Sequence, residues 1–410
     1  MKICIIGAGI SGLSLAQMLT DRHDVTIYEK SDVVGGIART KTIDNITFHQ
    51  VGGHCFNSNN NKVLDFVFDK ILPKNKWNKV HRVAKIFFKE NLISYPIEYA
   101  IKEIEKFDSK LAFNMTKDFL SCSERKSTKN LSEWFVANFG ETLAREYFIP
   151  YNQKIWQTKL DKVSADWIEG KLPVPNKYDF FTSLLHPKID SMPHATFYYP
   201  KSNNQNTFID AMASYLEIQF NKNVFSIEKK TEGWIVNELE YFDLVISTIP
   251  LNLLPFIIRK TPEFIKEQAK KLKYNKVTNV LWKTEENEHT WTYFPSEKSI
   301  FHRHIHIGNF FSPKKNYTIT ESIGDVSFEK MVKYGLQEKY LLEPVAYNVS
   351  DHAYVLFDSN YKEVTTNIKS YLNDIGLYTL GRFGEWEYYN MDICIEKAMI
   401  MAEKINTLSD

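Results

Sequence analysis

Three glycines near the amino terminus have a spacing that suits the binding of a dinucleotide. Gly7, Gly9 and Gly12 form the pattern GxGxxG directly after a short apolar run, and the acidic Glu29 closes the next strand-like run. Gly7 permits the tight turn, Gly9 lets the backbone approach a pyrophosphate, and Gly12 lets helix and strand pack closely. The helix amino terminus offers N–H groups to the anion, and Glu29 accepts hydrogen bonds from ribose hydroxyls.

A second glycine pair indicates which dinucleotide is bound. Residues 34–40 read VGGIART, so that Gly35 and Gly36 are followed by Arg39. This stretch resembles the extended FAD fingerprint of amine-oxidase-like flavoproteins, which plain Rossmann-type NAD enzymes lack. The resemblance implies FAD, with Arg39 at its phosphates. Four further residues are expected in the cofactor site: Lys30, Val224, Met391 and Asp392.

Three further segments resemble the UDP-galactopyranose mutase-like family of nucleotide-sugar pyranose/furanose mutases. Residues 52–57, GGHCFN, are similar to the stretch that these mutases place against the flavin ring. Residues 151–156, YNQKIW, are similar to their tyrosine, lysine and tryptophan motif. Residues 381–392, GRFGEWEYYNMD, are similar to their carboxyl-terminal motif and keep its arginine-to-tyrosine spacing. The similarities cover most of the chain in the same order.

The resemblance implies an enzyme that interconverts the pyranose and furanose forms of a nucleotide-diphosphate sugar for surface polysaccharide synthesis. In that family the N5 atom of the reduced flavin attacks the anomeric carbon, so the reduced form is active and no net oxidation occurs. The protein then positions the sugar and neutralises the charge of the diphosphate. The residues carried over are His54 against the flavin ring, Arg382 and Arg303 at the diphosphate, Tyr388 and Tyr151 as donors to its oxygens, and Trp156 at the base or sugar pocket.

Two departures from the family pattern leave the identity of the sugar open. Where the mutases have an arginine after a Leu/Ile-Pro-Val step, this chain has Pro175. Where they have a Gly-Gly turn, it has Asn203 and Asn204. The nucleotide and the physiological reductant are open as well.

Two other functions share this fold. An FAD-dependent oxidase or desaturase of the amine-oxidase and protoporphyrinogen-oxidase type would carry hydride to an acceptor. A non-catalytic escort resembling Rab GDP-dissociation inhibitors would lack flavin, which Gly35, Gly36, Arg39 and Asp392 argue against.

Three alternating histidines, His302, His304 and His306, suggest a metal site, but strand geometry opposes one. Same-face residues on a strand lie about 6.6 Å apart, so the outer two are about 13 Å apart and do not reach one ion. We expect no metal, and we expect the opposite face, with Arg303 and Ile305, to be turned toward the pocket.

Composition sets limits on the class of protein. The 410 residues carry a formal net charge of +1, which argues against a nucleic-acid or membrane-surface binder. The four cysteines form no CxxC pair, and no run of about 18 apolar residues occurs. The chain enters a strand at once, without a leader pattern. We expect a cytoplasmic protein without membrane insertion. A homodimer is compatible with these features.

The pattern of elements predicts an α/β fold with a Rossmann-like, glutathione-reductase-like FAD domain. Strand-like runs and a helix at the amino end form a βαβ unit, a buried strand at 244–249 returns to it, and a helix from Met391 to Ile405 ends the chain. We expect a discontinuous FAD domain (1–75, 197–265 and 345–410), a mainly helical substrate-binding insertion (76–196, with helix formers from Asn61 to Gly170), and a mixed or antiparallel sheet layer (266–344).

Overall fold

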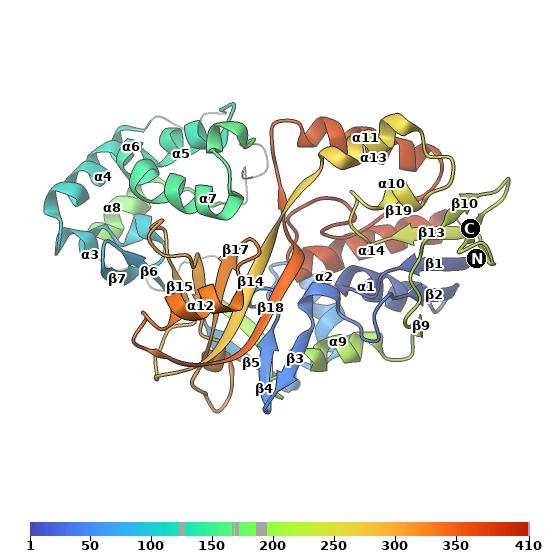
Figure 1. Cartoon of the computed structure of the whole chain (residues 1–410), viewed down its shortest axis with the longest axis horizontal. Helices are drawn as coiled ribbons and strands as arrows, with labels where there is room; N and C mark the ends of the chain where they lie inside the picture. The colour runs from blue at the N-terminus through green and yellow to red at the C-terminus, as the bar shows by residue number, and fades with distance from the viewer. Residues whose placement is uncertain (123–127, 166–167, 169–171, 186–194, 409–410) are drawn as a thin grey trace.

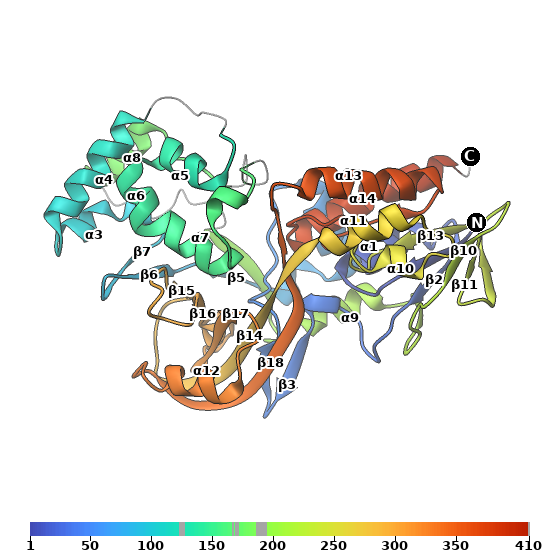
Figure 2. The ribbon, with the colours of Figure 1, turned by 45° about the horizontal axis from the view of Figure 1, so that its top comes forward.

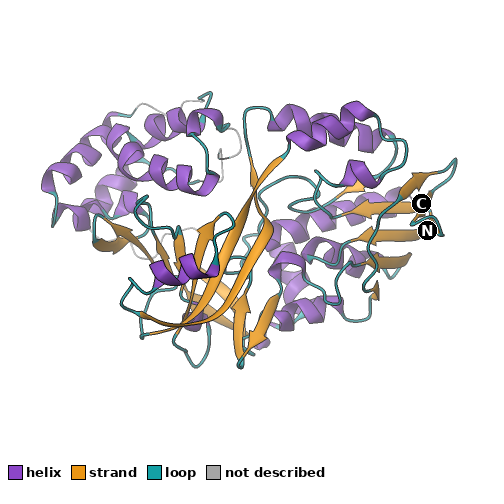
Figure 3. Cartoon of the chain, viewed as in Figure 1, coloured by secondary structure: helices purple, strands orange, loops and turns teal. Residues whose placement is uncertain are grey.

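The computed structural model describes residues 1–122, 128–165, 168, 172–185 and 195–408. Three parts are visible: a parallel sheet with its helices near both termini, a body of helices on the opposite side, and a sheet of long strands below and between them (Figure 1). The colouring by element type separates the helical body from the sheet that supports it (Figure 3).

The parallel sheet is built from segments far apart in the chain. Its order is β19-β13-β1-β2-β9, and all its pairs are parallel. The strands are β1 (Lys2–Ile6), β2 (Asp24–Tyr28), β9 (Glu217–Gln219), β13 (Leu244–Ser247) and β19 (Tyr378–Thr379). After its first residue β1 is buried, as expected for a strand covered on both faces. The predicted βαβ unit and the return of residues 244–247 to it are confirmed.

Helices cover both faces of this sheet. α1 (Ile10–Leu19) packs against α14 (Met391–Leu408) and α9 (Asn206–Ala213), so the two ends of the chain share one apolar cluster. α10 (Leu254–Ile257), α11 (Glu263–Lys271) and α13 (Tyr361–Asp374) form a separate group, in which α11 packs on both of the others (Figure 2).

A seven-stranded sheet forms the second layer, in the order β18-β14-β17-β16-β15-β6-β7. Its strands are β6 (Ala84–Phe88), β7 (Asn91–Ser94), β14 (Lys273–Thr284), β15 (Trp291–Tyr293), β16 (Arg303–Ile305), β17 (Tyr317–Ile323) and β18 (Leu341–Leu356). All pairs are antiparallel except β15 with β6. β16 is short because a 3₁₀ turn, Ile307–Phe310, follows it. The boundary expected at residue 345 falls inside β18.

The helical body contains α3 (Ile101–Glu105), α4 (Ser109–Ser121), α5 (Leu131–Phe139), α6 (Glu141–Leu143), α7 (Ile149–Trp156) and α8 (Lys177–Leu185). Two of these helices, α4 and α5, begin at polar caps: the side chains of Asp108 and Asn130 accept from the amides of Leu111 and Glu133, both at 2.9 Å. The tract rich in helix formers from Asn61 to Gly170 also contains strands, at 77–81, 84–88 and 91–94, and its end at Gly170 lies outside the described residues. β6 and β7 pair because their apolar side chains Ile86 and Ile93 face each other across the ladder.

Small elements join these layers. They are the hairpin β3 (Thr40–Ile43) and β4 (Ile46–His49), the pair β5 (Trp77–His81) and β8 (Thr196–Pro200), the ribbon β10 (Ile227–Lys229), β11 (Trp234–Val236) and β12 (Glu240–Phe242), and the helices α2 (Asn61–Asp65) and α12 (Phe328–Gly335).

Candidate active site and family membership

One cavity of about 1020 Å³ is lined by residues from all three parts of the fold. The lining includes Gly7, Gly9, Glu29, Lys30, Gly35, Gly36, Arg39, His54, Tyr151, Arg303, Arg382, Tyr388, Met391 and Asp392. The cavity therefore brings together most of the residues that the sequence singled out. Its volume is at the upper end of the range for small-ligand sites, which suits a cofactor together with a substrate.

The first glycine turn is shaped to admit a phosphate. A Cβ on Gly7 would lie 2.4 Å from Thr248 Oγ1, and a Cβ on Gly12 would lie 2.1 Å from the Gly7 carbonyl oxygen. Neither position accepts a side chain. A Cβ on Gly9 would meet no atom within 4 Å, so at Gly9 the open space belongs to the cavity. This open, backbone-lined surface at the start of α1 fits the pyrophosphate of a dinucleotide.

Glu29 fixes the first glycine turn and can still accept further hydrogen bonds. Its Oε2 accepts from the amide of Ala8 at 2.8 Å and its Oε1 accepts from the amide of Ser31 at 2.9 Å. An ionised carboxylate has about four acceptor positions, so two stay available to ribose hydroxyls.

The second glycine pair lies directly against the first glycine turn. The amide of Gly35 donates to the carbonyl of Ala8 at 2.8 Å, and a Cβ on Gly36 would lie 3.3 Å from the Cα of Gly9. The backbone dihedral φ is +105° at Gly35 and +54° at Gly36, values that favour glycine. Arg39 follows at the cavity surface.

His54 lines the cavity and carries a ring nitrogen without a hydrogen-bond partner among the described residues. This nitrogen, Nε2, is buried. Burial, together with the nearby charges of Arg382 and Arg303, lowers the pKa of His54 to about 4. At neutral pH the imidazole is uncharged. An unpartnered polar atom in this position fits a cofactor ring with complementary polar atoms, and Gly52 and Gly53 let this segment pass close to Arg303 and Ile305.

Arg303 is held by a buried carboxylate. Its Nε donates to Glu321 Oε1 at 2.9 Å and its Nη2 donates to the hydroxyl of Tyr354 at 3.0 Å. Burial acts to raise the pKa of Glu321, but Arg303 and the hydrogen bond from His302 outweigh it and bring that pKa to about 2. Glu321 is therefore ionised and fixes the guanidinium at the cavity wall.

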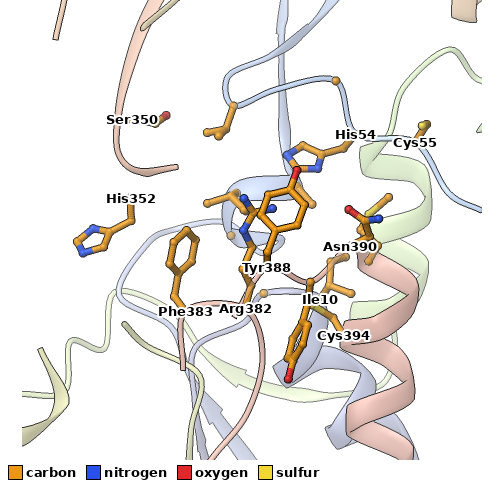
Figure 4. Close-up of a pocket in the computed structure, with 18 of the residues that line it drawn as sticks. Ile10, His54, Cys55, Ser350, His352, Arg382, Phe383, Tyr388, Asn390 and Cys394 are labelled. Carbon is orange, nitrogen blue, oxygen red and sulfur yellow. The ribbon is translucent and has the colours of Figure 1, made fainter. Parts of the chain in front are cut away.

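Arg382 lies among aromatic rings and contacts β18. Its Nη2 donates to the carbonyl of Ala353 at 2.8 Å, and its guanidinium lies 4.4 Å from the ring centre of Tyr388. Tyr388 stacks parallel to Tyr354 with 6.2 Å between ring centres. Figure 4 shows Arg382, Tyr388 and His54 gathered in the pocket, with Asn390 at the adjoining start of α14. The Nε of Arg382 is buried and has no partner among the described residues.

Three of the residues that the sequence analysis placed in the site, Gly12, Trp156 and Val224, lie outside this cavity lining, and Gly12 instead lies close against the Gly7 carbonyl. Trp156 is buried and meets Phe357 edge-on, and Val224 belongs to the core under the parallel sheet. Tyr151 does line the cavity, where it contacts the rings of Tyr147 and Tyr293. The cavity roles suggested for Trp156 and Val224 stay predictions.

Several lining or supporting residues were missed from the sequence. They are Arg82, Tyr95, Glu98, Tyr293, Glu321 and Tyr354. Glu321 carried a usable signal, since it is a lone acidic residue in the run YTITESI, where strand residues on one face are otherwise apolar or hydroxylic. The others lie in segments without a recognisable motif.

The three alternating histidines lie in the core. His302 contacts Glu321 at 2.9 Å, His304 contacts the Tyr340 hydroxyl, and His306 lies 2.9 Å from the hydroxyls of both Thr292 and Thr318. In the described ranges no group of three His, Cys, Asp or Glu side chains is arranged to hold a metal ion. The helices in those ranges include none that is long and apolar enough to cross a membrane.

Comparison with known proteins shows similarity over nearly the whole chain. Residues 10–294 match the family of flavin-containing amine oxidoreductases. UDP-galactopyranose mutase from Mycoplasma genitalium is 25% identical, with 98% of this chain and 94% of that protein covered. UDP-galactopyranose mutase from Mycoplasma pneumoniae is 27% identical over 39% of this chain and 41% of its own length.

Solved structures show the same fold. A crystal structure of reduced UDP-galactopyranose mutase superposes with a TM-score of 0.87 at 22% identity, covering 99% of this chain and 96% of its own. A protein assigned as a protoporphyrinogen oxidase from Exiguobacterium gives 0.74 at 16% identity, with 98% of each chain covered. Both the match along the sequence and the glycine-lined cavity lead to one conclusion: the chain belongs to the flavin-containing amine oxidoreductase family.

Proposed function

We propose that the protein is an FAD-dependent mutase that interconverts the pyranose and furanose forms of a nucleotide-diphosphate sugar. The observation that carries the proposal is the pair of arginines, Arg303 and Arg382, that lines one cavity beside the unpartnered Nε2 of His54. Full-length similarity to a UDP-galactopyranose mutase supports it. A role in surface polysaccharide synthesis and a place in the cytoplasm remain predictions.

The cofactor site that we propose follows the chain's own geometry. The parallel sheet with α1 and α14 would be a Rossmann-like FAD domain of the glutathione-reductase-like type, discontinuous as predicted. Gly9 and the start of α1 would hold the pyrophosphate, Glu29 the adenosine ribose, and His54 would face the flavin ring. When bound there and reduced, the flavin would supply the nucleophile for the anomeric carbon.

The residues of this chain supply charge and position. Arg303, fixed by Glu321, and Arg382, held by the Ala353 carbonyl, neutralise the diphosphate as it leaves the sugar and gains charge. The hydroxyls of Tyr388 and Tyr151 donate to its oxygens. His54 stays neutral beside the two guanidiniums, because burial and those charges oppose its protonation. The aromatic walls exclude water and hold the sugar near the reacting centre.

The test is incubation of the purified, flavin-loaded protein with a panel of nucleotide sugars before and after reduction with dithionite. We expect an isobaric product from the reduced protein, many turnovers for each reducing equivalent, and none from the oxidised protein. An oxidase would behave oppositely, since it starts from oxidised flavin and consumes one acceptor per product. Stoichiometric oxygen consumption with a nucleotide-free amine or porphyrin-like substrate would replace the mutase assignment. A flavin-free purified protein would favour the escort function.

A further inference from the structure

The cavity wall formed by the helical body carries a buried carboxyl group without a partner. Glu98 lies in the 3₁₀ turn Ile97–Tyr99 and lines the cavity, and only 5% of its surface is exposed. Its Oε2 is buried and has no hydrogen-bond partner in the described part of the chain. A buried carboxyl oxygen that makes no bond is unfavourable, so its presence at a cavity indicates a partner in the ligand.

No protein cation neutralises Glu98 within the described residues. Arg82 lines the same cavity, but its Nη2 donates to the hydroxyl of Tyr293 at 2.7 Å, and its guanidinium lies between the rings of Tyr95 and Trp291, 5.3 and 5.0 Å from their centres. Burial raises the pKa of Glu98 to about 7. The carboxyl therefore lacks the ion pair that a purely structural buried glutamate normally makes.

The surroundings place Glu98 close to the reacting centre. Tyr95, three residues before Glu98, lines the same cavity as Arg382 and Tyr388. The ring of Tyr95 packs against that of Tyr293, tilted by 38° and with 5.1 Å between ring centres. Tyr293 in turn meets Tyr151, the other tyrosine of the proposed diphosphate site, edge-on with 5.9 Å between ring centres, so a series of aromatic contacts links the segment that carries Tyr95 and Glu98 to that site. The sugar is attached at that site, whereas the base lies a diphosphate and a ribose further away.

We propose that Glu98 recognises the sugar ring of the substrate by accepting hydrogen bonds from its hydroxyl groups. This inference rests on the proposed mutase function and names the residue that selects the sugar. The two oxygens of a carboxylate accept from neighbouring hydroxyls at once, and bonds to a charged acceptor are the stronger ones. A buried acceptor also rejects a sugar that lacks the hydroxyl, because the oxygen is then left unpaired. The pocket would therefore favour a sugar with free hydroxyls over deoxy forms.

The experiment compares binding of UDP alone with binding of UDP-galactose and UDP-glucose to the flavin-loaded protein by calorimetry. The variant is Glu98→Gln, which keeps the shape but removes the charge, and the control is Glu105→Gln, an exposed carboxylate on the following helix. For Glu98→Gln we expect the affinity for the better UDP-hexose to fall on the order of tenfold or more, which corresponds to about 1.4 kcal/mol. Affinity for UDP should stay within about twofold, and the control should match wild type.

Deoxyfluoro analogues of that UDP-hexose identify the hydroxyl. Replacing the recognised hydroxyl should weaken binding to wild type and have little effect on Glu98→Gln. If the variant loses flavin, Glu98→Asp is measured instead, and its shorter reach should give the same sugar-dependent loss.

The outcomes separate the two proposals. Equal losses for UDP and UDP-hexose would assign Glu98 to the nucleotide and overturn the sugar assignment. Unchanged UDP-hexose affinity in a folded, flavin-loaded Glu98→Gln protein would overturn the role of Glu98 alone. Failure of wild type to bind any nucleotide or nucleotide sugar would overturn the mutase proposal and this inference with it.

Discussion

Arg303 and Glu321 lie directly opposite each other on the neighbouring strands β16 and β17 and form a buried ion pair. Their positions are partners in the ladder, and Arg303 Nη2 lies 2.8 Å from Glu321 Oε1. The side chain of Glu321 is 0% exposed. The strand register, rather than any local motif, therefore fixes the orientation of one of the two arginines at the proposed diphosphate site.

Glu321→Gln should destabilise the protein because it leaves the Arg303 guanidinium buried without its anion. Breaking a buried pair by removing one partner costs about 3 kcal/mol, whereas an exposed pair is worth under about 1 kcal/mol. Urea denaturation gives the free energy of unfolding. The control is Glu343→Gln, which removes the exposed pair with Lys283 at 2.8 Å. Equal losses in the two variants would contradict the importance of the buried pair.

Arg382→Ala should slow the mutase reaction while flavin content stays normal. A diphosphate leaving group gains charge as its bond breaks, so loss of a charge-assisted donor should lower kcat by roughly 10²–10³. The exposed Arg259, paired with Glu238, provides the control variant Arg259→Ala. Steady-state assays of the reduced protein measure the rate, and flavin absorbance reports the cofactor. An undiminished rate in Arg382→Ala would contradict the mutase assignment but not the assignment of the fold.

Gly9→Val should impair flavin binding, whereas Gly12→Ala should impair folding. The backbone φ at Gly9 is −79° and its Cβ direction is open, so valine should fold there but occupy the space of the phosphate. A Cβ on Gly12 would collide with the Gly7 carbonyl, so alanine should destabilise the fold itself. Flavin absorbance and thermal unfolding of the flavin-free proteins separate the two effects. Full flavin content in Gly9→Val would show that the pyrophosphate lies elsewhere.

Glu98 should make the free energy of unfolding fall as pH rises. Its pKa is raised from 4.5 to about 7 by burial, so the folded protein holds this proton more tightly than the unfolded chain. The contribution is fully present below pH 4.5 and is lost as pH rises toward 7 and through it. The difference between wild type and Glu98→Gln in urea denaturation, measured from pH 4.5 to 8, should show this slope. Parallel curves would mean that Glu98 is not buried in the folded protein.

The sequence by itself determined the features whose physics is local. One βαβ unit contains Gly7, Gly9, Gly12 and Glu29. The glycine turn, the start of the helix and the acidic residue expected at the ribose follow one another at short separations in the sequence, so their pattern predicted both this unit and its position. Arg382 and Tyr388 likewise belong to one short segment. Apolar runs at 2–6 and 244–247 were long and uniform enough to predict buried parallel strands.

Only the tertiary structure decided how distant segments meet. The strands between 77 and 94 were missed because two of them, 77–81 and 84–88, pair with distant segments at 196–200 and 291–293, and because the surrounding sequence is rich in helix formers. Glu321 faces Arg303, and Arg82 and Glu98 reach the cavity, through the register of the second sheet and the placement of the turn at 97–99. A lone acidic residue in a strand-like run can suggest burial, as at Glu321, but its partner cannot be read from the sequence, because the free energy of a buried charge depends on which groups the fold brings within a few ångströms.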